Sequence, residues 1–401
     1  MKIINVVGAR PNFMKIAPII RAMDEHNRLG KRPVLQSLLV HTGQHYDYQM
    51  SKAFWGDLQI PEPDVHLHVG SGTHAVQTGR AMMRFEAVLM AQKPDLVTVV
   101  GDVNSTLACA LAAAKLLVPV AHVEAGMRSF DRTMPEEINR VLTDVVSTFL
   151  FTPGEDAVEN LVKEGIPRER IFEVGDVMVD SLLYSLPRAR ASPILDRLGL
   201  SGMEEGSSRC AHGVEYAVLT LHRPHNVDDE GALTRILRAA DIIAQHIPIV
   251  FPIHPRTRKR LKAFGLDSSL KRIALRSVSS SRPARHHVVC GPGVYLTNPL
   301  GYLDFIKLMM ESKLVMTDSG GIQAETTVLG VPCLTLRDST ERPITLKQGT
   351  NTLVSNDTEG IVEAASRVLA GRGQKSIVRP ALWDGRAAER IVRILSSPLP
   401  P

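Results

Sequence analysis

The clearest signal of the fold lies in residues 96–128, which read LVTVVGDVNSTLACALAAAKLLVPVAHVEAGMR. Two short β-branched runs, 96–100 and 120–123, flank an alanine-rich segment of helical character. A strand, a helix and a second strand in this order form a βαβ unit with parallel strands. Each run ends in polar residues, which places candidate chemistry at the carboxyl edge of the sheet.

The same alternation continues outward in both directions. Further strands are expected at 3–7, 38–41, 149–151, 217–221, 249–253, 314–317 and 332–336. The pattern breaks near 175–187, and a Ser-, Gly- and Arg-rich stretch at 188–213 is typical of a surface excursion. We therefore expect an α/β protein with two Rossmann-like domains, 1–178 and 179–375, facing a central cleft. The helical tail at 376–401 can pack back on the first domain.

Composition excludes several classes of protein. The chain has 401 residues, 44% apolar and 22% charged, as in folded enzymes. No apolar run is long enough for a signal peptide or a membrane span, so a cytoplasmic protein without a membrane partner is expected. The four cysteines are far apart in sequence, which argues against zinc ribbons and disulfides. The one dense basic run, 256–262, lacks aromatic residues and predicts a solvated helix face, not nucleic-acid binding.

The first strand-to-helix turn, residues 8–15, reads GARPNFMK. It has a single glycine, so it is neither a dinucleotide fingerprint nor a P-loop. Arg10 and Lys15 flank a helix N-terminus, which suits a phosphate or diphosphate oxygen. As surface charges they would have no such role, but their place at a strand's carboxyl edge favours binding.

Three acids follow the strands of the first half. Asp102 and Glu124 come just after neighbouring strands, and Glu136 opens a helix after Pro135. Glu136 could also simply complement the helix dipole, and Asp102 could cap a helix. Together with Arg128 and Arg140, such a cluster can hold carboxyls in different protonation states for acid and base work.

The second half offers a different chemistry. Residues 314–325 read as a strand, a Ser319-Gly320-Gly321 turn and a helix start. The glycine backbone N–H groups can cradle phosphate oxygens, and Glu325 can accept hydrogen bonds from ribose hydroxyls. A purely structural turn is the alternative. His222 ends another strand and is expected to carry a proton or contact phosphate, while no histidine spacing fits a metal site.

Seven short motifs follow one another along the chain. They are Gly8-Ala9-Arg10-Pro11, Gly101-Asp102, His122-Val123-Glu124-Ala125-Gly126-Met127-Arg128, Pro135-Glu136-Glu137, His222-Arg223, Asp318-Ser319-Gly320-Gly321-Ile322-Gln323 and Glu341-Arg342-Pro343. In type and order they resemble the motifs of the non-hydrolysing UDP-N-acetylglucosamine 2-epimerase family, from residue 1 to about residue 370.

The resemblance implies a glycosyltransferase-B-like fold and a homodimeric isomerase. The resemblance also implies interconversion of UDP-GlcNAc and UDP-ManNAc, the latter feeding polysaccharide or cell-envelope synthesis. Asp102, Glu124, Glu136 and His222 look like the catalytic group. The residues that look like nucleotide and diphosphate contacts are Arg10, Lys15, Ser319, Gly320, Gly321, Glu325 and Arg342, with Phe305 near the uracil.

The implied mechanism agrees with the absence of a dinucleotide fingerprint. The C2 proton of the sugar is not acidic, so epimerisation requires oxidation or departure of UDP from C1. Elimination is the simpler route: a carboxylate removes the C2 proton and 2-acetamidoglucal accepts a proton on its other face. We expect no NAD, pyridoxal phosphate or metal cofactor.

Some positions depart from the family pattern. His225 and Ile344 stand where many members carry Glu, which bears on sugar specificity and rate. Gln44-His45-Tyr46 replaces the Gln-His-Arg of members that substrate activates, so no such activation is expected. Three alternatives stay open: a 2-epimerase of a modified sugar such as UDP-2,3-diacetamido-2,3-dideoxyglucuronic acid, a glycosyltransferase of the same fold, and a non-catalytic nucleotide-sugar sensor.

Overall fold

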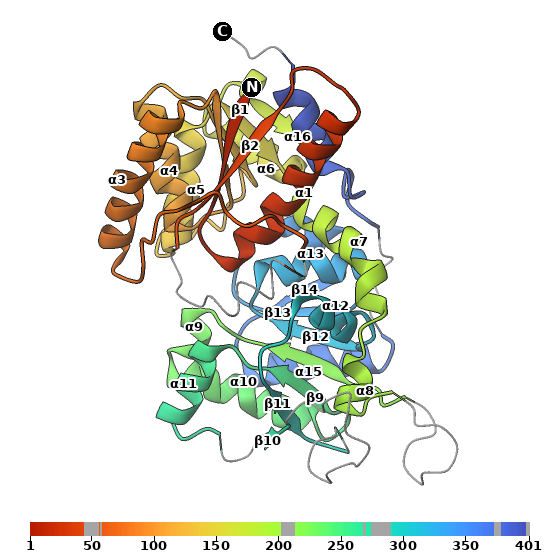
Figure 1. The fold of residues 1–401 in the computed structure, drawn as a ribbon. Helices are drawn as coiled ribbons and strands as arrows, with labels where there is room; N and C mark the ends of the chain where they lie inside the picture. The colour runs from red at the N-terminus through yellow and green to blue at the C-terminus, as the bar shows by residue number, and fades with distance from the viewer. Residues whose placement is uncertain are drawn as a thin grey trace. The chain divides into compact units, whose positions relative to one another are not determined.

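The computed structural model describes residues 1–43, 56, 58–201, 213–267, 270–273, 289, 291–372 and 378–397 (Figure 1). The chain divides into two compact units. The first contains Met1–Tyr184 and Pro380–Pro401, and the second contains Ser185–Arg379. Each is built on a seven-stranded sheet whose described pairs are all parallel.

The sheet of the first unit has the order β3-β2-β1-β4-β5-β6-β7. Its strands are β1 (Lys2–Val7), β2 (Gln36–His41), β3 (Val65–His66), β4 (Leu96–Val100), β5 (Val120–Val123), β6 (Phe149–Thr152) and β7 (Ile171–Glu173). The central strands β4 and β5 are buried at every residue, which explains why their sequences are apolar apart from Thr98 and His122. The strand order reverses between β1 and β4, the point where open α/β sheets bind ligands.

Helices cover this sheet. They are α1 (Arg10–Arg28), α3 (His74–Gln92), α4 (Asn104–Lys115), α5 (Pro135–Val146), α6 (Glu155–Lys163) and the C-terminal α16 (Ala387–Leu395). The helix α16 packs against α1 (Figure 1). Two contacts fix this tail: Asp180 accepts hydrogen bonds from the first backbone N–H groups of α16, and the Trp383 indole donates to Pro153 O at 2.9 Å.

The second unit repeats the arrangement with the order β10-β11-β9-β8-β12-β13-β14. Its strands are β8 (Ala217–Thr220), β9 (Ile249–Pro252), β10 (Lys271–Arg272), β11 (Val294–Thr297), β12 (Leu314–Thr317), β13 (Cys333–Leu336) and β14 (Asn351–Val354). The order reverses between β8 and β12. The residues that follow these two strands are therefore expected at a ligand site.

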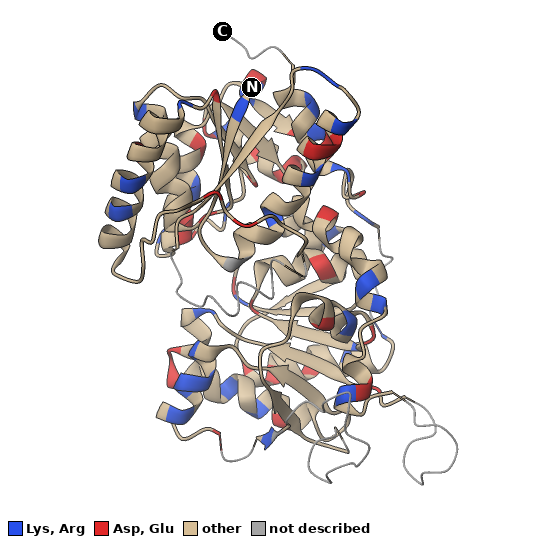
Figure 2. Ribbon diagram, in the orientation of Figure 1, with Lys and Arg blue, Asp and Glu red and all other residues tan. Residues whose placement is uncertain are grey.

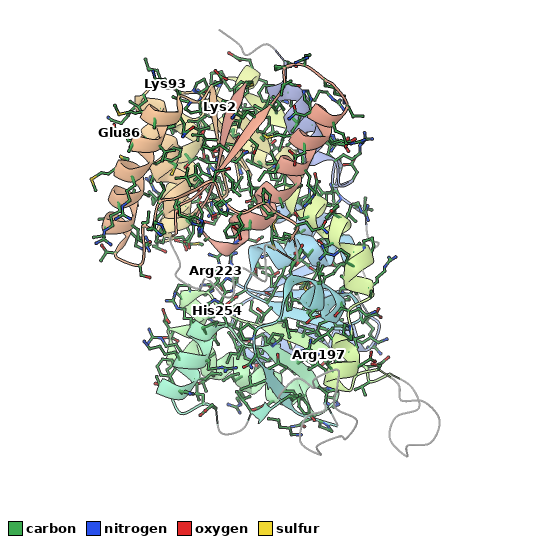
Figure 3. The ribbon with its side chains drawn as sticks, in the orientation of Figure 1. Lys2, Glu86, Lys93, Arg197, Arg223 and His254 are labelled. Carbon is green, nitrogen blue, oxygen red and sulfur yellow. The ribbon has the colours of Figure 1, made fainter. Side chains whose placement is uncertain are left out.

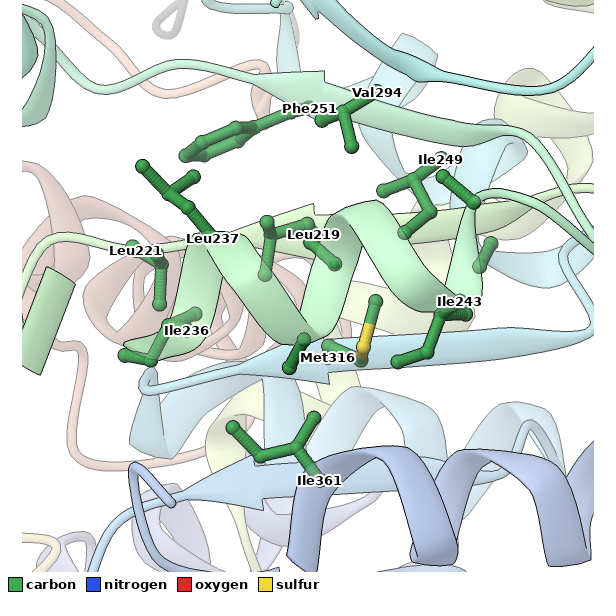
Figure 4. Packing of buried hydrophobic residues seen from close by; sticks show 14 of the residues in the cluster. Leu219, Leu221, Ile236, Leu237, Ile243, Ile249, Phe251, Val294, Met316 and Ile361 are labelled. Atoms are coloured by element: carbon green, nitrogen blue, oxygen red, sulfur yellow. The ribbon is translucent and has the colours of Figure 1, made fainter. Parts of the chain in front are cut away.

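The helices of the second unit are α8 (Ile194–Leu198), α9 (Pro224–Val227), α10 (Glu230–Ile243), α11 (Pro255–Ala263), α12 (Tyr302–Met310), α13 (Gly320–Leu329), α14 (Pro343–Lys347) and α15 (Thr358–Leu369). One core fills the space between the sheet and α10 and α15. Figure 4 shows Leu237 and Ile243 of α10 and Ile361 of α15 packed with Leu219 and Met316 of the strands. Burial of this apolar surface is the main force that holds the unit together.

One expectation from the sequence is wrong in part. Residues 188–213 were expected to be a surface excursion, but α7 (Val177–Arg190) continues through the start of this stretch and α8 follows it. Ile194 and Leu198 are fully buried and four residues apart, so they share one face of a helix. That short apolar spacing outweighs the Ser, Gly and Arg around it. Residues 202–212 lie outside the described part of the chain.

The basic run at 256–262 forms α11, where Figure 2 shows Lys and Arg with acidic residues beside them. Arg256 and Arg260 both pair with Asp228. Of the cysteines, Cys109 and Cys333 are buried free thiols, and Cys210 and Cys290 lie outside the described residues. Among the described helices, none is long and apolar enough to cross a membrane.

Candidate active site

The loops after β4 and β5 leave their strands through left-handed backbone. Gly101 has φ +69°, as a glycine readily does, but Glu124 has φ +72°. For a residue with a Cβ this conformation costs roughly 1–2 kcal/mol. Strain of this kind at an acidic residue is typical of a functional site, because the surrounding structure must hold the side chain in place.

Each of the two strand-end acids has a cationic partner. The Lys15 ammonium of α1 forms an ion pair with the Glu124 carboxylate, and both side chains are almost fully buried. Arg140 of α5 lies 2.5 Å from the Asp102 carboxylate. Glu124 also approaches the backbone of Gly101, the neighbour of Asp102. Lys15, which was predicted to bind phosphate, is therefore paired in this structure with Glu124, which was predicted to be catalytic.

The buried polar face of α5 is organised by Glu137. Its carboxylate accepts from the backbone N–H groups of Ser129 and Phe130 at 3.0 and 2.9 Å, and it pairs with Arg140 at 2.7 Å. Burial alone would raise the pKa of Glu137, but these N–H groups and the guanidinium more than offset that effect and lower it. Glu136, the predicted acid, is the half-buried preceding residue. Glu137 thus fixes the arginine that holds Asp102.

Behind these loops lies a pair with no exposed atoms, His122 of β5 and Asp144 of α5. The ring Nδ1 is 2.6 Å from Asp144 Oδ1, and the ring Nε2 is 2.9 Å from the carbonyl oxygen of Gly101. The other oxygen of Asp144 accepts from the backbone N–H of Gly126 at 3.1 Å and from Arg128 at 2.7 Å. The pair therefore touches both loops of the site.

The turn after β1 is closed by a side chain that sequence reasoning did not single out. Asn12 accepts from the backbone N–H groups of Gly8 and Ala9 at 3.1 and 2.9 Å and donates to the carbonyl oxygen of Val100 at 2.9 Å. It thereby ties the start of α1 to the end of β4. The Arg10 side chain lies outside the described part of the structure.

In the second unit, His222 and Asp318 follow the two strands at which the order reverses. Their side chains meet at 2.9 Å, Nδ1 to Oδ1. Asp318 is completely buried and also accepts from the backbone N–H groups of His222 and Arg223. Burial alone would raise its pKa, but the imidazole and these N–H groups lower the pKa to about 2. Asp318 is therefore a permanent carboxylate that orients a partly exposed histidine.

The glycine turn opens α13, with Ser319 as its N-cap residue. A Cβ at Gly320 would overlap the Glu341 carboxylate, so any side chain there would displace Glu341. Glu341 is held in turn by Arg337 at 2.7 Å, with Arg223 at 3.7 Å. Arg223 and His254 both come from loops at the carboxyl edge of the second sheet (Figure 3).

The remaining predicted contacts also lie in the second unit. Glu325 is buried and accepts a hydrogen bond from the Tyr302 hydroxyl at 3.1 Å. Arg342 is buried at the start of α14, and Phe305 of α12 packs against a hydrophobic core. Their proposed roles toward a nucleotide remain predictions. Among the described residues, no group of three or more His, Cys, Asp or Glu is placed to hold a metal ion.

The clusters of both units include residues whose sequence signals were weak. Glu137 could have been found from its three-residue spacing to Arg140 on one helix. Asp318 immediately precedes the Ser319-Gly320-Gly321 turn, and the sequence predicted no role for its side chain. His122 and Asp144 have no local signal, since 22 residues separate them and each lies within a regular element.

Comparison with known proteins agrees with the site. The family model described as UDP-N-acetylglucosamine 2-epimerase matches residues 27–396. The chain is 42% identical over 398 residues to UDP-N-acetylglucosamine 2-epimerase of Methanocaldococcus jannaschii, covering 99% of each chain. It is 41% identical over 399 residues to UDP-2,3-diacetamido-2,3-dideoxy-D-glucuronate 2-epimerase of Pseudomonas aeruginosa, again covering 99% of each.

Solved structures give the same result. The crystal structure of the M. jannaschii UDP-GlcNAc 2-epimerase, in complex with UDP-GlcNAc and UDP, matches with a TM-score of 0.84 and 41% identity over 99% of both chains. The predicted α/β fold and the predicted relationship are thereby confirmed. The chain belongs to the UDP-N-acetylglucosamine 2-epimerase family.

Proposed function

We propose that this protein interconverts UDP-GlcNAc and UDP-ManNAc by elimination and re-addition of UDP. The observation that carries the proposal is the pair of carboxylates, Asp102 and Glu124, at the ends of neighbouring strands with a cation on each. The cation beside each carboxylate holds it in one position, as a proton carrier requires. The family relationship supplies the substrate class.

In the forward direction one carboxylate removes the proton from C2 of the sugar. The electron pair of that C–H bond forms a C1=C2 double bond, and the bond between C1 and the bridging oxygen breaks. UDP leaves with the bonding pair, and 2-acetamidoglucal remains. Delivery of a proton to the opposite face of C2, with attack of UDP on C1, gives the epimer. Two faces require two proton carriers, which we assign to the cluster Asp102, Glu124 and Glu136.

The second unit supplies the groups for the leaving nucleotide. The N-terminus of α13 at Ser319, Gly320 and Gly321 offers backbone N–H groups to phosphate oxygens. We propose that Arg342 and the chain's Arg10 take up the charge that develops on UDP and that Glu325 binds the ribose. His222, oriented by Asp318, is proposed to protonate or hydrogen-bond the departing phosphate.

The test is direct. Purified protein is incubated with a panel of UDP-sugars, and the anomeric and C2 proton signals are followed by NMR. UDP-GlcNAc should convert to an equilibrium mixture with UDP-ManNAc without added cofactor and after dialysis against a chelator. A panel in which no sugar changes configuration at C2 contradicts the proposal. Activity lost to the chelator and restored by a metal contradicts the cofactor-free mechanism.

A second substrate is favoured by one comparison. The relative that acts on UDP-2,3-diacetamido-2,3-dideoxy-D-glucuronate is 41% identical over the whole chain, almost the same as the UDP-GlcNAc epimerase. That substrate differs by a second acetamido group and a carboxylate. Adding this UDP-sugar to the panel distinguishes the two candidate substrates, because the preferred one has the higher kcat/KM.

We further propose that the protein is a cytoplasmic homodimer whose product feeds polysaccharide or cell-envelope synthesis. Support for assembly comes from exposed apolar side chains on two helices of the first unit, α3 and α5, which both pack against α4. They are Val76, Met83 and Met90 on α3, and Leu142 and Val145 on α5. Apolar surface of this kind commonly marks a protein interface. Light scattering on the purified protein measures the mass: twice 43.9 kDa is expected.

A further inference from the structure

The buried pair of His122 and Asp144 lies directly beneath both acid-bearing loops, and neither side chain exposes any surface. The groups that the pair contacts, at Gly101, Gly126 and Arg128, are themselves buried. Its backbone contacts lie next to the two acids. The ring Nε2 reaches the carbonyl of Gly101, which precedes Asp102, and Asp144 accepts from the N–H of Gly126, which follows Glu124 by two residues.

The hydrogen-bond geometry fixes the protonation of the ring. The carbonyl oxygen of Gly101 can only accept, so Nε2 must donate to it at 2.9 Å. Asp144 accepts from Gly126 and from Arg128 through Oδ2, and its pKa is lowered, so it is a carboxylate and Nδ1 must donate to its Oδ1 as well. Both ring nitrogens therefore carry a proton, and His122 is an imidazolium.

The charges around this imidazolium are balanced. Asp144 lies between His122 and Arg128, and Arg128 also donates from Nε and Nη2 to Glu164, the residue after α6, through two hydrogen bonds of 2.7 Å. Burial alone would raise the pKa of Asp144, but the imidazole and the guanidinium more than offset that effect and lower it. The two cations and two anions cancel, which allows charged groups to persist inside the unit.

The loops need such a support. Gly101 and Glu124 both have positive φ, and for Glu124 this conformation is strained. Without a hold on the Gly101 carbonyl, the peptide that leads into Asp102 is free to rotate toward ordinary backbone angles. A shift of about 1 Å at a reacting group is enough to lower a rate by roughly 10²-fold.

We propose that His122 is a positioning residue for the epimerase reaction, a cationic clasp that fixes the Gly101 carbonyl and, through Asp144, the Gly126 amide. The proposal rests on the function proposed above. Asp102 and Glu124 act on the sugar, while His122 holds the two loops at a fixed separation. The Nε2 contact sets the position of Asp102, and the Nδ1 contact mainly keeps the buried charges paired.

Two amide substitutions separate the two contacts. In His122→Asn the side-chain amide nitrogen takes the place of Nδ1, so the bond to Asp144 remains and the Gly101 carbonyl is released. In His122→Gln the amide nitrogen takes the place of Nε2, so the Gly101 carbonyl is held and Asp144 loses its donor. His246→Asn, at an exposed histidine of the second unit, is the matched control.

The two variants are expected to rank in opposite order for stability and for kcat. His122→Asn should be the more stable variant, since the buried carboxylate keeps its partner, but the slower enzyme, with kcat lowered by roughly 10²-fold. His122→Gln should melt at a lower temperature but lose only about tenfold in kcat. KM should stay within about threefold in both, because neither removes a substrate contact. The control should match the wild type.

Two results overturn the proposal: an unchanged kcat in His122→Asn, or a loss of kcat that simply follows the loss of stability in both variants. A neutron structure of the wild-type protein gives a second decision that needs no variant. Deuterium on both ring nitrogens supports the clasp, and a bare Nε2 refutes it. A wild type that epimerises no sugar of the panel refutes the proposed function instead, and the neutron density still decides the clasp.

Discussion

Each unit of the molecule has a histidine–aspartate pair at the carboxyl edge of its sheet, and the two pairs differ in exposure. His122 meets Asp144 at 2.6 Å with both side chains sealed from solvent, whereas His222 meets Asp318 at 2.9 Å with 35% of the histidine side chain exposed. The same contact therefore serves different purposes. A sealed ring with both nitrogens engaged can only hold its neighbours, while an exposed ring with one nitrogen anchored can act on a ligand.

The two aspartates also differ in what they position. Asp144 bridges two cations and a backbone amide, so its role is distributed over several elements. Asp318 accepts mostly from His222 and Arg223 in the loop after β8, so it orients the histidine side chain and the backbone of that loop together. The predictions below test this difference, beginning with the groups that the sealed pair is proposed to position.

The largest effect is expected at the acids themselves. Asp102→Asn and Glu124→Gln should each lower kcat by roughly 10²–10⁴-fold, the range for loss of a positioned proton carrier. These losses should exceed the loss in His122→Asn, because that variant displaces Asp102 without removing it. Glu159→Gln, an exposed acid on α6, is the matched control. If the His122 variant is slower than both acid variants, His122 does more than position them.

Loss of the outer ring nitrogen of His222 should slow catalysis without affecting folding. In His222→Asn the amide nitrogen replaces Nδ1 and keeps the bond to Asp318, while the outer ring nitrogen is lost. We expect kcat to fall about 10²-fold, the lower limit for a proton carrier, and the unfolding midpoint to stay within about 2 °C. Steady-state kinetics and thermal melting of the same preparation measure both. A kcat equal to that of the wild type would mean that His222 does not take part in catalysis.

The smallest effect concerns stability and pH. The pKa of Asp318 is lowered to about 2 in the folded protein, from an ordinary value of 3.8. A lowered carboxyl pKa contributes stability above pH 4, about 2 kcal/mol, which disappears as the pH falls from 4 toward 2. Asp318→Asn should therefore destabilise the protein at pH 7, and its deficit should shrink on acidification. Denaturant unfolding at pH 7, 5 and 3.5 checks this trend; a deficit that grows below pH 4 has the opposite sign.

The sequence predicted much of the architecture because its signals were local. The β-branched runs of the central strands and the polar residues after them identified the α/β fold, and the order of the motifs identified the family. The edge strands β3, β7 and β10 were missed because two or three residues carry no usable period. The four-residue strands β11 and β14 were missed too, although strands of the same length such as β5 were predicted.

The site was predictable to a lesser extent, for the same reason. Asp102 and Glu124 follow strands that are consecutive in sequence and adjacent in the sheet, so their neighbourhood could be inferred. The partners of these acids come from elsewhere: Lys15 from α1 and Arg140 from α5. His122 faces the interior from within a strand, and only the fold shows that a charge from α5 meets it there.

The proposed elimination of UDP from C1 is tested most directly by an isotope in the bridging oxygen. UDP-GlcNAc labelled with oxygen-18 between C1 and the β-phosphorus is incubated with the enzyme in heavy water, and the recovered substrate is examined by phosphorus NMR and mass spectrometry. The C1–O bond must break in every turnover, so the label should scramble among the oxygens of the β-phosphate while C2 takes up deuterium. Prolonged incubation should also release a little UDP and 2-acetamidoglucal. Epimerisation with the bridging label fully retained and no glucal released would contradict the account.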